Sequence, residues 1–199
     1  MSFVNVPAYP SPSSVSVRLI SSMNELKPTF GGPVQRVSRP GSRFAIDVTL
    51  PPMTPETARP WLAILAAGSG SSAIRMPFPQ GRTQIGPLGS PVVNGAGQAG
   101  TSLSVRGVTP AGVVPAGHAF TIMTNGQPYN YMLTESAVAS GGGVALLKFG
   151  PMLRRPPADG DQVLIAQPVI EGWAFSGGGQ WSIDTASNFG LEFTLAERD

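Results

Sequence analysis

A period-two alternation marks the segment RFAIDVTL at residues 43–50. Every second residue is apolar, which is the pattern of a β-strand with one buried face. Pro51 and Pro52 follow at once, and we expect them to end the strand, because proline has no backbone N–H to donate to a ladder. The apolar residues of this face are Phe44, Ile46, Val48 and Leu50.

The following segment changes to helical spacing. Thr54 suits the N-cap position and Pro55 the first helical position. Pro60 lies inside the pattern, where it removes a hydrogen bond and clashes with the preceding turn. We therefore expect a short turn and then a helix over about residues 59–67. Its apolar stripe, at i, i+3, i+4 and i+7, consists of Ala58, Trp61, Leu62 and Leu65, and should pack on the apolar face of the strand.

The rest of the chain consists of short apolar runs between turn residues. Residues 74–78 predict an edge strand, because Pro77 and Pro79 cannot donate to a ladder. From residue 80 to 100 the composition shifts to Gly, Pro, Asn, Gln and Ser, which indicates a boundary. Short strands at regular intervals follow, with Asn125-Gly126 as a hairpin signal.

We therefore predict a mainly β fold with two domains. Residues 1–82 and 168–199 form an N-terminal β-barrel or sandwich with one α-helix, completed by C-terminal strands. Residues 83–167 form an inserted small β-barrel or sandwich domain.

Composition favours a folded protein that associates with other subunits. Charged residues make up 12% and hydrophobic residues 41% of the chain, with 25 glycines and 21 prolines. So few charges suit a surface that other subunits cover. The net charge of +2 predicts neither specific nucleic-acid binding nor direct membrane insertion. The chain has no cysteine, its start does not resemble a signal peptide, and no apolar run approaches the roughly 20 residues of a membrane span.

Three motifs suggest chemistry only weakly. The run from Gly95 to Gly100 matches G-x-G-x-x-G, but a predicted strand follows it, whereas a dinucleotide site needs a helix. His118 is the only histidine, which favours a turn or surface residue over a catalytic base. Asp159 and Asp161 flank a glycine as in a calcium loop, but further ligands do not follow, so a solvated turn is favoured.

Nothing beyond their presence supports an acid/base pair of Glu171 and Asp184. We therefore predict no catalytic residue, no metal site and no cofactor, and a protein that is not an enzyme. Arg36, Arg39 and Arg43 are read as solvated loop residues, although phosphate or an acidic partner would suit them. Core or interface packing is favoured over sugar stacking for the aromatic residues Trp61, Trp173, Trp181, Tyr129 and Tyr131.

Several runs resemble minor tail proteins of long-tailed bacteriophages and prophages. The first is R-x-A-I-D-V-x-L-P-P-M-T-P at residues 43–55, followed by Trp61 and the helix. Others are G-Q-A-G-T-S-L at 97–103, A-G-H-A-F-T-I at 116–122 and P-M-L-R-R-P-P-A-D-G-D at 151–161. The last is W-S-I-D-T-A-S-N-F-G-L-E-F at 181–193, so the resemblance extends from about residue 25 to the end. His118 stands where the family pattern has an aspartate.

The resemblance implies a distal tail protein of the tail tip or baseplate. Such a structural virion protein forms a homo-oligomeric ring, usually a hexamer, that joins the tail tube protein to hub and fibre proteins. It implies location in the virion and, during assembly, in the bacterial cytoplasm. The strand and helix would then belong to the ring-forming part, with Arg59 near a neighbouring subunit. The alternative is a receptor- or carbohydrate-binding tail module carried by residues 83–167.

Overall fold

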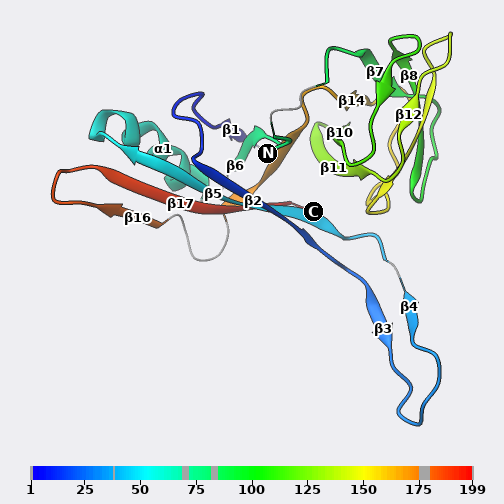
Figure 1. Cartoon of the computed structure of the whole chain (residues 1–199), viewed down its shortest axis with the longest axis horizontal. Coiled ribbons are helices and arrows are strands. Elements are labelled where there is room, and N and C mark those ends of the chain that lie inside the picture. Colours follow the sequence, from blue (N-terminus) through cyan, green and yellow to red (C-terminus); the bar gives the residue numbers. More distant parts are fainter. Residues whose placement is uncertain (1, 38, 69–71, 82–84, 175–179, 199) are drawn as a thin grey trace. The chain divides into compact units, whose positions relative to one another are not determined.

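The protein is mainly β, as predicted. The structure is a computed structural model that describes residues 2–37, 39–68, 72–81, 85–174 and 180–198, and Figure 1 shows its elements. Contacts divide the chain into two units. The first comprises Met1–Arg18, Phe44–Pro79 and Val169–Asp199, and the second comprises Leu19–Arg43 and Gln80–Pro168. This division differs from the expected domains in placing residues 19–43 with the second unit.

The first unit is a seven-stranded sheet with one helix. The strand order is β1-β6-β15-β17-β5-β2, and β16 pairs with β17 beside this path. Within the described residues the sheet keeps two ends, at β1 and β2, and so differs from the expected barrel or sandwich. The C-terminal strands complete it, as predicted. Its strands are β1 (Phe3–Asn5), β2 (Ser14–Ile20), β5 (Arg43–Met53), β6 (Ala73–Pro77), β15 (Val169–Ala174), β16 (Gln180–Ile183) and β17 (Phe189–Glu197).

Strand β5 confirms the alternating pattern but does not end where expected. It continues through both prolines to Met53. The register with β17 shifts here, since Leu50 faces Leu191 whereas Met53 faces Phe189. Three steps along β5 therefore match two along β17. Such a bulge interrupts the ladder, and a proline is tolerated there because its missing N–H is not required.

Strand β6 is not an edge strand, contrary to expectation. It pairs with β15 on one side and, in parallel, with β1 on the other. The parallel partners cover only residues 73–75 of β6. Pro77 is the last residue of the strand, so its missing N–H falls outside the region that β1 pairs with. The three-residue β1 is too short to produce an alternating pattern that sequence reasoning detects.

Helix α1 (Pro55–Gly68) begins earlier than expected and includes Pro60. The carbonyl of Thr54 accepts hydrogen bonds from the N–H groups of Thr57 and Ala58, at 3.1 and 3.0 Å, which fixes the first turn. Pro60 is exposed, so the bond that it cannot make is lost on the solvent side. The buried stripe compensates for this loss. It consists of Ala58, Trp61, Leu65 and Gly68, and the helix lies against β1, β6 and β15.

The second unit contains a closed six-stranded barrel with the order β10-β11-β13-β8-β7-β14. Phe120, Tyr131 and Phe149 meet in its core, with ring centroids 5.0–5.8 Å apart. The predicted hairpin turn is confirmed, because Asn125 and Gly126 both have positive φ, at 52° and 76°. The strands are β7 (Gly89–Val93), β8 (Ser102–Val108), β10 (Ala119–Thr124), β11 (Gln127–Leu133), β13 (Ala145–Gly150) and β14 (Gln162–Leu164), with β9 (Val113–Val114) and β12 (Ala137–Val138) forming a separate two-stranded sheet.

Residues 21–42, which connect β2 to β5, contain a long hairpin. Its strands are β3 (Asn24–Leu26) and β4 (Gln35–Val37), and Asn24, Glu25 and Leu26 face Val37, Arg36 and Gln35 in antiparallel register. The turn between the strands holds Gly31 and Gly32, whose φ angles are 81° and 141°. We call residues 23–40 the arm.

Candidate functional site

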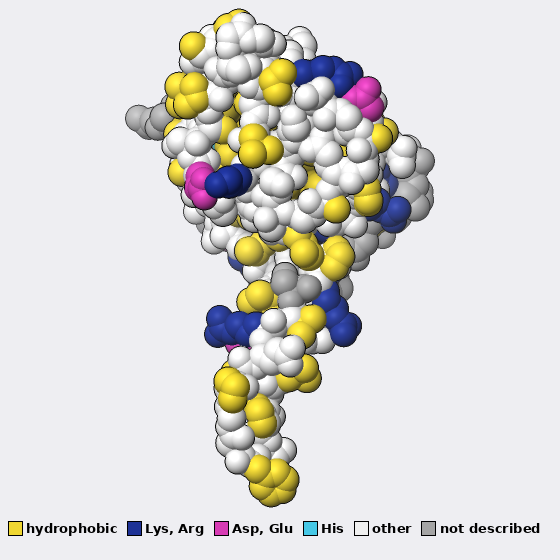
Figure 2. Space-filling model, turned by 90° about the vertical axis from the view of Figure 1, so that its right-hand side faces the viewer, with side chains coloured by type: hydrophobic (Ala, Val, Ile, Leu, Met, Phe, Trp, Pro, Cys, Tyr) yellow, Lys and Arg dark blue, Asp and Glu magenta, His cyan; other side chains and the backbone are white. Residues whose placement is uncertain are grey.

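The arm carries several large apolar side chains that are exposed to solvent. Every residue from 23 to 36 is exposed. Phe30 at the tip is 100% exposed and Leu26 is 57% exposed, while Met23 and Val34 are 47% and 50% exposed. Figure 2 shows apolar side chains along the arm as far as its tip. Large exposed apolar groups gathered on one segment are typical of an interaction surface.

The arm is also basic. Lys27, Arg36 and Arg39 outnumber its single acid, Glu25. Glu25 lies 3.0 Å from the Arg36 Nε and 3.7 Å from the Lys27 Nζ. Of the predicted arginine group, Arg36 and Arg39 are exposed, whereas Arg43 is half-buried at the start of β5. A partner of this arm should therefore combine apolar and acidic groups.

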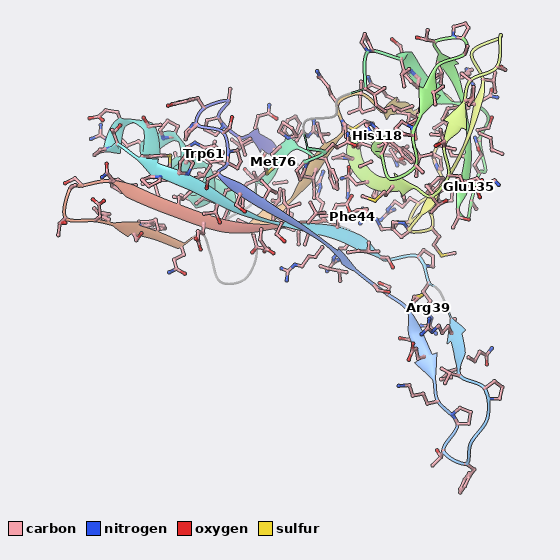
Figure 3. The ribbon with its side chains drawn as sticks, viewed as in Figure 1. Arg39, Phe44, Trp61, Met76, His118 and Glu135 are labelled. Carbon is pink, nitrogen blue, oxygen red and sulfur yellow. The ribbon has the colours of Figure 1, made fainter. Side chains whose placement is uncertain are left out.

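The predicted core residues of the first unit are buried. Phe44, Ile46, Val48 and Leu50 are at most 5% exposed, and Phe44 meets Phe78 edge to face at 5.4 Å. Trp61 is 1% exposed and projects from α1 toward β17, with its ring 6.2 Å from that of Phe193 (Figure 3). Leu65 is buried too, and the exposed candidate is Arg59. Apart from Arg59, these residues hold the fold, because little of their surface is left for a partner.

Glu171 and Asp184 are not brought together. Glu171 is fully buried on β15, between Arg75 of β6 and Arg198 after β17. Its Oε2 lies 2.5 Å from Arg75 Nη2 and accepts from Arg75 Nε at 2.8 Å, and Oε1 pairs with Arg198 Nη2. Asp184 instead accepts the N–H groups of Ala186 and Asn188 in an exposed turn. The Glu171 cluster is a buried ion network that links three segments of the first unit.

His118 is buried rather than exposed, and it ties the barrel together. Its Nε2 lies 2.8 Å from the carbonyl oxygen of Ile165 and 3.3 Å from Nε2 of Gln80. Gln80 in turn accepts the N–H of Ala119 at 2.8 Å. These contacts join the strand that follows His118 to the segments that enter and leave the barrel, so this histidine has a structural position.

The G-x-G-x-x-G run forms a tight connection between β7 and β8. A strand follows it, which removes the helix that a dinucleotide site requires. Gln98 organises the loop, since its Nε2 donates to the carbonyls of Asn94 and Gly95, each at 3.0 Å. Its Oε1 accepts the N–H of Ser104 at 2.6 Å. The three glycines at positions 95, 97 and 100 all have positive φ, so they serve the turn.

Asp159 is a structural partner of this loop. It forms an ion pair with Arg106 of β8 and accepts the N–H of Gly95 at 2.8 Å. The hydrogen bond from Arg106 lowers the pKa of the Asp159 carboxyl below its ordinary value, and the Gly95 N–H adds to this effect. Asp161 accepts the N–H of Ala158 at 2.9 Å. The two carboxylates therefore stabilise turns of the barrel.

This arrangement predicts an acid-dependent loss of stability that D159N removes in part. Because the carboxyl of Asp159 has a lower pKa when folded than when unfolded, it contributes stability above about pH 4, which is lost as the pH falls through the folded-state pKa. Unfolding midpoints measured from neutral pH to strong acid should fall less steeply for D159N. R106M removes the same hydrogen bond and should flatten the profile similarly; a D159N profile parallel to the unaltered protein would contradict this role.

Three of the five aromatic residues considered for sugar stacking, Trp61 among them, are buried. Tyr129 and Tyr131 are 3% and 1% exposed. The guanidinium of Arg154 lies 4.7 Å from the centre of the Tyr129 ring, and the backbone N–H of Arg154 donates to the Tyr131 hydroxyl at 3.2 Å. Trp181 on β16, in contrast, is 54% exposed. The barrel therefore uses its tyrosines for packing.

Among the described residues, no three His, Asp or Glu side chains come together as metal ligands. In the same part of the chain, no helix has the length and apolarity needed to span a membrane.

Neither protein-family models nor curated proteins match the sequence. The arm therefore stands as the candidate functional site on its own geometry. The exposure of Leu26 and Phe30 was not predicted from the sequence. The only signal was the interruption of apolar residues by glycine and proline, which fits a surface hairpin as well as a loop.

Proposed function

We propose that this protein is a structural ring subunit of a bacteriophage tail tip, a distal tail protein that joins the tail tube to the hub and fibres. The exposed apolar arm carries the proposal, because residues 23–36 expose Met23, Leu26, Phe30 and Val34 together. A surface of this kind suits permanent association. The tail-protein resemblance of residues 43–55 and 181–193 supplies the kind of assembly.

The low proportion of charged residues and the structural contacts of the polar motifs also support a structural role. Only 12% of residues are charged. Glu171, considered for catalysis, and Asp159, considered for metal binding, are both held in ion pairs. A subunit whose surface is largely covered by neighbouring subunits needs fewer charged residues for solubility than a free monomer does.

The oligomeric state of the purified protein tests this proposal. Light scattering should give a mass of several subunits, and electron microscopy should show closed rings, six-membered if the resemblance holds. A variant in which residues 24–37 are replaced by Asn-Gly should lose the ring but keep the circular dichroism of a β protein. A monomer at every concentration, together with absence of the protein from phage particles, would refute the proposal.

A further inference from the structure

We propose that the arm of one copy adds as extra strands to the outer edge of β16 on a second copy. This inference rests on the proposed function and names the contact that would repeat around the ring. Strand addition to an exposed edge uses backbone hydrogen bonds for affinity and alternate side chains for specificity. Both halves of the contact are on this one chain.

The receiving edge belongs to β16. Within the described residues this strand pairs with β17 alone, and all four of its residues are exposed. Its other edge therefore presents N–H and C=O groups to a further strand. Trp181 and Ile183 are 54% and 58% exposed and share one face, because they are two residues apart.

The opposite face of this edge is acidic and polar. Ser182 points there, and Glu192 of β17 shares this face because its partner in the register is Gln180. Both residues are exposed. Between residues 180 and 192 the charged residues are Asp184 and Glu192, a net charge of −2.

The arm has the matching pattern. In its register Leu26 and Val37 lie on one face, and Glu25 and Arg36 are paired on the other, which Lys27 also shares. Among the described residues, β3 and β4 pair only with each other. An isolated two-stranded hairpin is at best marginally stable in water, so further pairing would stabilise it.

Placed along β16, the apolar face of the arm meets Trp181 and Ile183. Its cationic face lies on the same side of the sheet as Glu192, which is one strand further on, on β17. Lys27, Arg36 and Arg39, set against Glu25, give residues 23–40 a net charge of +2, opposite to the −2 of the edge. Such complementarity selects a partner and fixes the register. Because the arm and the edge are different surfaces, the contact is heterologous, and its repetition closes a ring when the rotation allows.

Charge reversal tests the contact in the full-length protein. The arm variant is K27E/R39E, which leaves the Glu25–Arg36 pair intact, and the edge variant is S182K/E192K, which leaves the Asp184 turn intact. Sedimentation velocity over a wide concentration range measures self-association. Each variant alone should associate at least about tenfold more weakly than the unaltered protein. All four substitutions in one chain, or a mixture of the two variants, should restore association.

Two substitutions that do not change the charge distinguish the loss of this contact from a general loss of exposed apolar surface. L26N should weaken self-association, whereas V138N should not, although Val138 is 62% exposed and Leu26 57% exposed. Val138 lies on β12 of the second unit, outside the proposed contact.

The outcomes also separate this contact from the ring itself. If both charge variants still form rings, or if combining them restores nothing, the arm-to-edge contact is wrong while the ring proposal stands. A protein that remains monomeric without any substitution overturns both. Loss with each variant and recovery on combination would establish the contact.

Discussion

Replacing Trp61 by alanine should lower the free energy of unfolding by about 3–5 kcal/mol. The side chain is 1% exposed and its ring lies 6.2 Å from that of Phe193, so truncation leaves a cavity between α1 and the sheet. Rigid neighbours in a two-layer core fill such a cavity only partly. Equilibrium denaturation at a concentration that keeps the oligomeric state constant measures the effect.

W181A is the matched control, because it makes the same chemical change at a side chain that is 54% exposed. Surface substitutions of this kind change stability by about 0.5 kcal/mol or less. Comparable losses for W61A and W181A would show that α1 does not cover the sheet as described.

Replacing Glu171 by glutamine should destabilise the first unit by about 3–5 kcal/mol, since it leaves two largely buried cations without their counter-charge. The side chains of Arg75 and Arg198 are 17% and 12% exposed, and that of Glu171 is fully buried. Chemical denaturation followed by tryptophan fluorescence reports on this unit, because Trp61, Trp173 and Trp181 all lie in it.

E135Q provides the control for the loss of a carboxylate. Glu135 pairs with Lys148 at 2.9 Å, but both side chains are more than half exposed, so water screens the pair. Its loss should have a small effect beside that of E171Q. An E171Q protein as stable as the unaltered protein would mean that Arg75 and Arg198 find other counter-charges. In that case we also expect the triple replacement of Arg75, Glu171 and Arg198 by apolar residues to be tolerated.

The sequence alone predicted those features of the fold that depend on local periodicity and turn residues. Alternation identified the buried face of β5, and turn chemistry identified the hairpin at Asn125-Gly126. The predicted start of α1 was wrong because the free-energy cost of Pro60 was considered without the packing of the buried stripe of the helix. The burial of Ala58, Trp61, Leu65 and Gly68 outweighs one missing hydrogen bond.

The sites that were missed depend on partners far apart in the chain. Glu171 meets Arg75, which lies 96 residues away, and no spacing rule connects the two. His118 meets the carbonyl of Ile165, 47 residues on, so its burial was not evident from the turn before it. The exposure of Leu26 and Phe30 depends on which segments pack against the arm. A local sequence pattern does not carry that information.

The register between β6 and β15 has an evolutionary consequence. Pro77 and Val169 are Cα partners, so the polypeptide leaves the sheet and returns to it at adjacent positions. Everything between them can change in length, or be exchanged for another module, without breaking the ladder, because a short turn would join the same two strands. The register therefore permits the barrel to be exchanged for another module, and we expect chains that share this sheet to differ most between these two residues.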